Sequence, residues 1–279
     1  MSMVGIMDSW ETIDVAGLAR FTDIRRVTET DSTNTQLVAL AKAGAPEGIV
    51  LMADHQRAGK GRLGRVWQAQ PGASLLVSVL VRPSVAPERA HLVTIAAALA
   101  AVDACSEVAG IRPLLKWPND LVIETSASGQ VRKLAGLLSE SVIEDGKLTA
   151  LIIGMGLNVN WPEVPDELAD IAVALNHLSD VNVERVELLG KWLLHFEDQY
   201  SALTGGDKSR EQELLDRYRQ ACFTLGQNVR VELSDGSVEG RAIDIDDGGH
   251  LLIKTRSEDG TLDLKQITAG DVIHVRPSP

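Results

Sequence analysis

Residues 53 to 67 form a glycine-rich segment that carries four cations, in a chain whose formal net charge is −12. The cations are Arg57, Lys60, Arg62 and Arg65, interspersed with Gly59, Gly61 and Gly64. Glycines let backbone N–H groups approach an anion closely, and neighbouring cations neutralise its charge. The segment therefore predicts a local anion site, and the alternative is a solvated basic turn.

The common phosphate-binding motifs do not account for this segment. Gly59–Gly64 matches the G-x-G-x-x-G pattern, but that loop opens a helix, whereas here Trp67 and Pro71-Gly72 lead into a predicted strand. No Gly-Lys pair is followed by Ser or Thr, as a Walker loop requires, and no G-x-S-x-G elbow occurs. The six histidines are isolated from one another in the sequence, so hydrolase and metalloenzyme chemistry are disfavoured.

Three other groups of residues could do chemistry. Ser32-Thr33-Asn34 places two hydroxyls and an amide at a predicted helix start, which favours a polar ligand or a plain helix cap. Lys116-Trp117-Pro118-Asn119-Asp120 places a cation, an aromatic ring, an amide and a carboxylate at a strand end, which favours function over a surface turn. Gly136, Gly154 and Gly156 lie within or next to predicted strands, where glycine indicates a closely approaching ligand or backbone, or a β-bulge.

The elements that must position these residues follow from hydrophobic spacing and from turn residues. We expect helices over 33–43, 87–108, 183–203 and 211–221, the second of them ended by Gly110. Strands are expected over 49–53, 74–81, 114–117, 121–124, 134–143 and 148–153, with a polar hairpin over 125–130. Strands over 229–233, 238–245, 251–255 and 272–275, separated by Asp-Gly turns, are typical of a small β-barrel. This predicts an α/β domain with a mixed sheet over residues 1–222 and a barrel over 223–279.

Composition limits the class of protein. An apolar content of 44% and a charged content of 24% are those of a soluble globular protein. The apolar stretch Val93–Val102 is about half a membrane span, and residues 1–7 lack a secretory signal pattern. Cys105 and Cys222 are isolated, so we expect packing thiols and a cytoplasmic location, with no membrane partner. The acidic balance disfavours nucleic acid as a partner, and a monomer or a weak homodimer is compatible with the sequence.

Five motifs, taken in order, resemble those of the biotin protein ligases over about residues 28 to 275. They are Ser32-Thr33-Asn34, Gln56 with Gly59–Trp67, Lys116–Asp120, Lys133-Leu134-Ala135-Gly136 and Gly156-x-Asn158-x-Asn160. The resemblance implies a catalytic domain similar to that of class II aminoacyl-tRNA synthetases, an α+β fold with flanking helices, followed by an SH3-like β-barrel. Lys60 stands where the family usually has arginine, which keeps the charge but loses the bidentate fork.

The resemblance also implies a reaction in two steps. Biotin and ATP, with Mg²⁺, give biotinyl-5′-AMP and pyrophosphate, and biotin is then transferred to a lysine of a biotin carboxyl carrier protein or domain of acyl-CoA carboxylases. The first step joins two anions, whose repulsion at about 4 Å is on the order of 4 kcal/mol at an effective dielectric of about 20. Three alternatives remain: a lipoate ligase or transferase, a biotin-storage protein, and a repressor, for which about 27 residues before the first motif are too few to form a DNA-binding domain.

The family motifs assign roles to residues of this chain. The catalytic cations would be Arg62, Lys133 and Lys116. Biotin would contact Ser32, Thr33, Asn34, Gln56, Gly59, Lys60, Gly61, Arg62, Lys133, Gly136, Gly154 and Gly156. ATP or the adenylate would contact Arg62, Arg65, Trp67, Lys116, Asn119, Lys133, Asn158 and Asn160, and Asp120 would hold Mg²⁺. Because water destroys an acyl-adenylate, we expect the glycine-rich segment to close over it.

Overall fold

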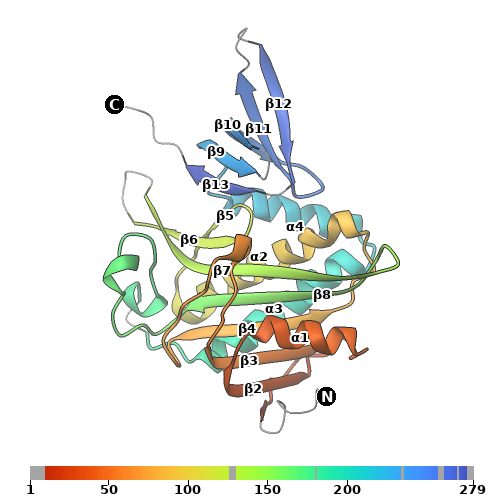
Figure 1. The fold of residues 1–279 in the computed structure, drawn as a ribbon, viewed down its shortest axis with the longest axis vertical. Coiled ribbons are helices and arrows are strands. Elements are labelled where there is room, and N and C mark those ends of the chain that lie inside the picture. Colours follow the sequence, from red (N-terminus) through yellow and green to blue (C-terminus); the bar gives the residue numbers. More distant parts are fainter. Residues whose placement is uncertain are drawn as a thin grey trace.

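A computed structural model describes residues 10–125, 130–179, 181–233, 236–256, 261–268 and 270–274. The tip of the hairpin predicted over 125–130 and the last residue of the strand predicted over 272–275 lie outside this range. Two sheets are present, one in each half of Figure 1, and the smaller one is built from the C-terminal strands.

The larger sheet has eight strands in the order β1-β2-β3-β4-β8-β7-β6-β5. The strands are β1 (Glu11–Ile13), β2 (Asp23–Thr30), β3 (Ile49–Gln56), β4 (Ser74–Val81), β5 (Leu114–Lys116), β6 (Asp120–Glu124), β7 (Val131–Glu144) and β8 (Lys147–Asn158). The pair β2–β3 is parallel and the other neighbours are antiparallel. The predicted mixed sheet is therefore confirmed.

Helices cover both faces of this sheet (Figure 1). One face packs against α1 (Thr33–Lys42), and the other packs against α2 (Ala90–Ala109), α3 (Arg185–Thr204) and α4 (Lys208–Ala221). Every residue of β4 is buried, because β4 lies between these two layers. The predicted end of α2 is confirmed, since Gly110 caps it in the left-handed conformation.

The helix α2 and the short turn η2 (Pro87–Arg89) before it form a stretch, Pro87–Ala109, that is long and apolar enough to cross a membrane. In this structure 78% of its apolar window is buried. Its alanines lie against α3 and the sheet, where small side chains allow close packing. The stretch therefore packs as a core helix.

The smaller sheet is antiparallel, with the strand order β12-β11-β10-β9-β13. Its strands are β9 (Asn228–Leu233), β10 (Gly236–Ile245), β11 (Leu251–Arg256), β12 (Leu262–Ile267) and β13 (Asp271–His274). Asp235, in the turn predicted between the first two strands, lies outside the described residues. The predicted domain boundary at Phe223 falls between the end of α4 and the start of β9.

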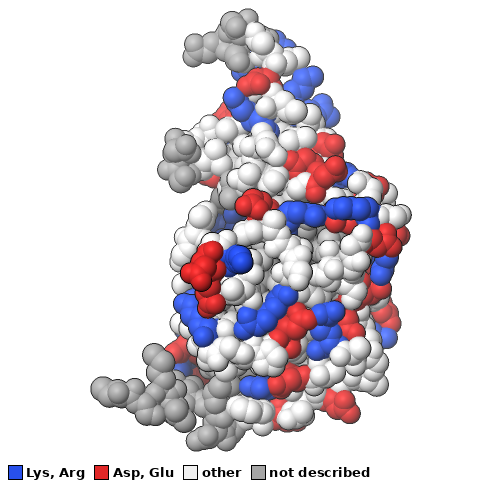
Figure 2. All heavy atoms as spheres, turned by 90° about the vertical axis from the view of Figure 1, so that its right-hand side faces the viewer, with Lys and Arg blue, Asp and Glu red and all other residues white. Residues whose placement is uncertain are grey.

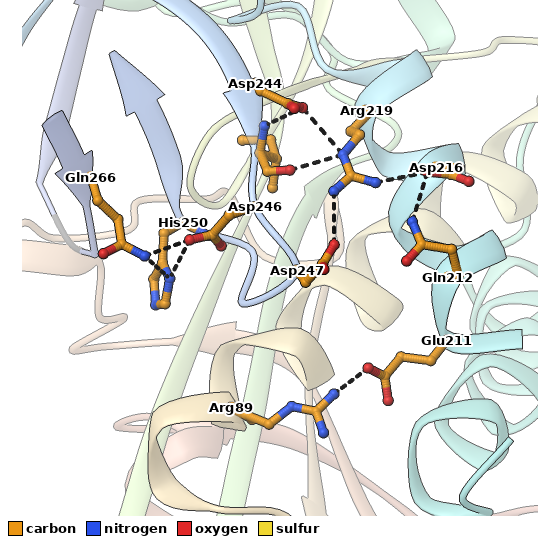
Figure 3. A network of polar contacts seen from close by, with 11 residues as sticks. Arg89, Glu211, Gln212, Asp216, Arg219, Asp244, Asp246, Asp247, His250 and Gln266 are labelled. Carbon is orange, nitrogen blue, oxygen red and sulfur yellow. Dashed lines mark hydrogen bonds and ion pairs between the residues drawn. The ribbon is translucent and has the colours of Figure 1, made fainter. Parts of the chain in front are cut away.

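Polar contacts join the C-terminal sheet to the catalytic half of the chain (Figure 3). Arg219 of α4 donates to the carbonyl of Ile245 at 2.8 Å and lies 3.3 Å from the carboxylate of Asp247. The indole of Trp117 donates to the carbonyl of Gly249 at 3.1 Å. The residues from 244 to 249 are therefore held from two sides, by α4 and by the turn between β5 and β6.

Candidate active site

The cationic segment between β3 and β4 folds as a narrow hairpin, residues 57–67, which we call the lid. Gly61 donates its N–H to Arg65 at 2.7 Å, and Trp67 donates its N–H to Gly59 at 3.0 Å. A Cβ on Gly59 would lie 2.5 Å from the carbonyl oxygen of Trp67, so this glycine permits the close approach of the two lid strands. At the tip, Leu63 adopts a φ of 56° within the turn η1 (Arg62–Gly64). Order gained by the lid on ligand binding stays a prediction.

Beneath the lid lies a small cavity of about 30 Å³, the inner cavity. Thr33 at the start of α1 donates its N–H to Oε1 of Gln56 at 2.8 Å, and its hydroxyl lies 3.1 Å from the same oxygen. Ser78 of β4 places its Oγ 2.6 Å from Oδ1 of Asn34 and 2.7 Å from Oγ1 of Thr33. The polar side chains of this cavity are thus bonded to one another. The lining comprises Ser32, Thr33, Asn34, Gln56, Lys60, Trp67, Val77, Gly136, Leu138, Gly154, Met155 and Gly156.

The glycines of the inner cavity accommodate side chains of this chain. A Cβ on Gly156 would lie 2.4 Å from Cε2 of Trp67, and one on Gly154 would lie 2.1 Å from Oδ1 of Asn34. A Cβ on Gly136 would lie 2.9 Å from Cε of Lys133. The space that we predicted for a ligand ring is therefore taken here by Trp67, Asn34 and Lys133.

The indole of Trp67 points its Nε1 into a buried position where it has no hydrogen-bond partner among the described residues. Buried N–H groups are ordinarily bonded, and an orphan needs an explanation. An acceptor on a bound substrate would satisfy it.

A larger cavity of about 230 Å³, the outer cavity, lies beside the inner one and shares Lys60, Trp67 and Gly136 with it. Lys133 of β7 forms a 2.7 Å ion pair with Asp120 of β6, and its Nζ lies 5.4 Å from the ring centre of Trp67. Arg62 of the lid donates to Oδ1 of Asn119 at 3.1 Å, and Asn119 donates to the carbonyl of Leu137. These contacts hold two of the three predicted catalytic cations, Lys133 and Arg62, around one space.

The remaining lining of the outer cavity mixes polar and apolar groups. Asn158 at the end of β8 is buried and donates to the carbonyl of Val173 at 3.1 Å, while its Oδ1 has no partner among the described residues. Leu63 and Val66 of the lid, with Ile171, are exposed at the rim. The other lining residues are Gly61, Arg65, Gln68, Leu138, Trp161, Leu168 and Ala172.

Three predicted site residues line neither cavity: Lys116, Asn160 and Gly59, the last of which forms part of the lid. Lys116 is half-buried on β5, opposite Asp120 in the β5–β6 pair, and Asn160 donates to the carbonyl of Val183 at 2.8 Å. Arg57, one of the four cations of the sequence motif, pairs with Glu29 and Asp31 outside the two cavities.

Two other predicted residues have mainly structural contacts. Ser32 caps α1, because its Oγ accepts from the N–H of Thr35 at 3.4 Å, although it also lines the inner cavity. Trp117 belongs to the Lys116–Asp120 motif that favours function, although no substrate contact is assigned to it; it is 3% exposed and packs between the two halves of the chain. The motif tryptophan is thus a packing residue.

Sequence reasoning missed two polar residues at the site. Ser78 is fully buried on β4 and bonds Asn34 in the wall of the inner cavity. Glu140 of β7 accepts from Asn34 at 2.8 Å and forms a 3.4 Å ion pair with Lys60 of the lid. A serine inside an otherwise apolar strand was a usable signal for Ser78.

A third cavity, of about 150 Å³, continues from Arg62 and Asn119 towards the C-terminal sheet. Its wall includes His91 of α2, whose ring lies 4.9 Å from that of His250. Burial lowers the pKa of His91 to about 4, and the charge of His250 adds to this effect. His91 is therefore neutral near pH 7.

The site offers few ligands for a metal ion. Asp120 is the one carboxylate in the lining of the outer cavity, and it pairs with Lys133. Within the described ranges no three His, Cys, Asp or Glu side chains gather in a metal-binding group. Mg²⁺ often takes one or two carboxylates together with substrate phosphates and water, and that arrangement fits Asp120.

The comparisons with known proteins agree with this geometry. The model of the biotin/lipoate A/B protein ligase family matches residues 26–158, and that of the biotin protein ligase C terminal domain matches residues 224–275. The chain is 33% identical to the biotin–[acetyl-CoA-carboxylase] ligase of Mycobacterium tuberculosis, over 98% of this chain and 93% of that protein. It is 34% identical to the bifunctional ligase/repressor BirA of Bacillus subtilis, over 86% of this chain and 70% of that protein.

A solved structure shares the whole fold. The biotin protein ligase from Aquifex aeolicus, in complex with biotin and ATP, superposes with a TM-score of 0.73 at 28% identity. The match covers 92% of this chain and all of that one. The predicted class, a class II synthetase-like domain with a C-terminal SH3-like domain, is therefore confirmed. The chain belongs to the biotin protein ligases of the biotin/lipoate A/B protein ligase family.

Proposed function

We propose that this protein joins biotin to ATP as biotinyl-5′-AMP, releasing pyrophosphate, and then transfers biotin to a lysine of a biotin carboxyl carrier domain. The observation that carries the proposal is the adjacency of two cavities: one is lined by neutral hydrogen-bonding groups, with Lys60 on its lid side, and the other by Lys133, Arg62 and Asp120. An uncharged ring and a pair of anions need these two environments. The names of the M. tuberculosis ligase and of the A. aeolicus complex agree with it.

In this proposal the inner cavity takes the ureido ring of biotin. Thr33 and Gln56 offer a hydroxyl, an amide and a carbonyl to the ring, and Lys60 stands at the lid side. The ring is larger than about 30 Å³, so Trp67 leaves the slot beside Gly156 when biotin enters. The indole then covers the valeryl tail.

The outer cavity takes the reacting carboxylate and the nucleotide. Attack of the biotin carboxylate oxygen on the α-phosphorus forms a P–O bond and breaks the bond to pyrophosphate. Lys133 and Arg62 both line this cavity and would neutralise the two anions. The buried Oδ1 of Asn158, which has no partner among the residues that the structure describes, could accept from a ribose hydroxyl or an adenine amino group. Asp120 would hold Mg²⁺, which would supply positive charge for the phosphate groups.

The second half-reaction needs a carrier domain to reach the site. The lysine amine attacks the acyl carbon of the adenylate, an amide forms, AMP leaves, and the amine loses its proton. A carrier from an acyl-CoA carboxylase is our proposal, in line with the name of the M. tuberculosis relative. A monomer or weak homodimer in the cytoplasm stays a prediction.

Nucleic acid is not part of the proposed function. The net charge of −12 supports this, because a polyanion is repelled by an acidic protein. On the face shown in Figure 2, basic side chains lie among acidic ones. A gel shift with DNA from upstream of the gene, with and without biotin and ATP, should show no specific complex.

Pyrophosphate exchange into ATP tests the proposed function directly. Biotin should stimulate exchange, whereas lipoate and octanoate should stimulate it weakly or not at all. A lipoate ligase is the second candidate because the matching family model includes such enzymes, but the biotin-type C-terminal domain favours biotin. Stimulation by lipoate and not by biotin would overturn the proposal. Biotin binding without exchange would show a storage protein.

A further inference from the structure

Glu140 connects the lid to the wall of the inner cavity. One oxygen of its carboxylate, Oε2, accepts from Nδ2 of Asn34 at 2.8 Å. The other, Oε1, lies 3.4 Å from Nζ of Lys60 on the lid. A single carboxylate on β7 thus contacts both the start of α1 and the lid.

The partner on the cavity side is rigidly held. Asn34 is 4% exposed, its Oδ1 accepts from Ser78 at 2.6 Å, and its Nδ2 also reaches the carbonyl of Leu138. The absence of a side chain at Gly154 leaves the room that the Asn34 amide needs. The carboxylate of Glu140 is therefore oriented before Lys60 contacts it, which lowers the entropy cost of the ion pair.

The partner on the lid side is more exposed to solvent. Side-chain exposure is 44% for Lys60 and 30% for Glu140, so water screens the pair and the bond opens readily. The groove under the lid is lined by residues 58–66 and by Leu138 and Glu140 of β7. Glu140 is the one carboxylate in that lining, facing a lid that carries several cations.

We infer that Glu140 is the anchor of the lid: a positioning residue that holds Lys60, and with it the hairpin, against β7. The anchoring itself needs no substrate. Its consequence for the reaction rests on the proposed function, because the lid would then cover biotinyl-5′-AMP. A held lid slows the escape of the adenylate and its attack by water. Glu140 lines neither the inner nor the outer cavity, so its charge would act through Lys60.

Amide hydrogen exchange in the protein without added ligands tests the anchoring. The readouts are the N–H groups of Gly61 and Trp67, which donate within the lid. Glu140→Gln keeps an acceptor for Asn34 and removes the charge, and it should speed their exchange roughly two- to fivefold, the range of a partly exposed ion pair. Lys60→Met should do the same. Glu144→Gln, an exposed carboxylate on the same strand, is the matched control and should leave exchange unchanged.

The double variant distinguishes an anchor from a structural defect. If the two side chains act through one bond, Glu140→Gln with Lys60→Met should exchange no faster than either single variant. If Glu140→Gln sped exchange only by disturbing the local structure, the increase in exchange rate would add to that caused by Lys60→Met. Additive effects, or wild-type exchange in Glu140→Gln, would overturn the inference.

Retention of the adenylate supplies the second readout. In single turnovers without a carrier, biotinyl-5′-AMP should leave Glu140→Gln roughly two- to fivefold faster than it leaves the wild type, with the Glu144→Gln control unchanged. Wild-type retention in Glu140→Gln would contradict the inference alone. A wild type that forms no adenylate would contradict the proposed function, and the hydrogen-exchange result would still decide the anchoring.

Discussion

Apart from Lys60 at the lid, the polar side chains of the inner cavity are neutral and bond one another, whereas the outer cavity is lined by charged and amide groups that come from separate elements. The inner cavity is formed by Thr33 at the start of α1, Gln56 at the end of β3 and Ser78 in the middle of β4. Thr33 and Ser78 are buried, and Gln56 is half-buried. Lys133 and Arg62 come from β7 and the lid, and their partners are Asp120 and Asn119.

The difference indicates how the protein divides its task. A neutral ring is selected by fixed donors and acceptors, and a fixed network is costly to disturb. Two anions are brought together by cations, and such cations need temporary partners when the anions are elsewhere. Asp120 and Asn119 supply those partners to Lys133 and Arg62. We therefore expect changes in the outer cavity to affect rate and changes in the inner cavity to affect stability and biotin affinity.

The largest effect is expected for Lys133→Ala. Loss of this cation removes charge stabilisation where carboxylate and phosphate meet, and biotin-dependent pyrophosphate exchange should fall roughly a hundred- to a thousandfold. The fold should survive, because the side chain is 36% exposed. Lys147→Ala, an exposed lysine at the start of β8, is the control. Near-wild-type exchange in Lys133→Ala would show that the outer cavity does not work through this cation.

Gly154→Ala should affect the inner cavity instead. The new Cβ would lie 2.1 Å from Oδ1 of Asn34, so the Ser78–Asn34 bond must break or the strand must shift. Overpacking of this kind lowers the free energy of unfolding by about 1–3 kcal/mol. Urea unfolding measures that loss, and isothermal titration with biotin measures the accompanying loss of affinity. Adding Asn34→Ala should recover part of the stability; a fully additive double variant would contradict the assigned clash.

Much of the fold could be predicted from local patterns. The bounds of the strand Ser74–Val81 were predicted correctly, because a continuous apolar run is a local signal. The cap of α2 at Gly110 was also predicted, because glycine is a local signal for the end of a helix. β2 was missed because its sequence, DIRRVTET, does not alternate, and the strand is stabilised by parallel pairing with β3. β12 was missed because its sequence, LDLKQI, alternates over only four residues, and five of its six residues are exposed in the structure.

The site could be predicted only as far as its motifs reach. The cavities are lined by Gln56, Lys133 and Asn158, as the motifs predict. These residues lie near the ends of strands that meet at the site. Glu140 could not be found, since its role depends on which lysine the lid places above β7. Lys116 could not be excluded, since only the geometry shows that its neighbour Asp120 reaches the outer cavity while it does not.

Acid should lower the stability of the folded protein through His91, which lines the third cavity, next to Arg62 and Asn119. The pKa of His91 is lowered from 6.5 to about 4, so the folded state binds fewer protons than the unfolded state between these values. Stability should therefore fall as the pH drops from about 6.5 towards 4. The pKa of this ring is also lowered by the charges of His250 and Arg89, and it is raised by Glu88 and Asp246. His91→Gln should flatten the profile of melting temperature against pH, and an unchanged profile would remove His91 as the cause.

The smallest effect is expected for Lys60→Arg, which introduces the arginine that the motif resemblance leads us to expect at this position. Lys60 reaches one oxygen of Glu140 at 3.4 Å, whereas a guanidinium can donate two parallel bonds to a carboxylate. The lid should be held more firmly, and exchange at the amides of Gly61 and Trp67 should slow about twofold, within the range of a partly exposed ion pair. Combined with Glu140→Gln, the same substitution should bring no gain. If the double variant exchanged more slowly than Glu140→Gln alone, the arginine would be held by another acceptor. The position of the lid would then depend on contacts at the outer cavity rather than on Glu140 at the wall of the inner cavity.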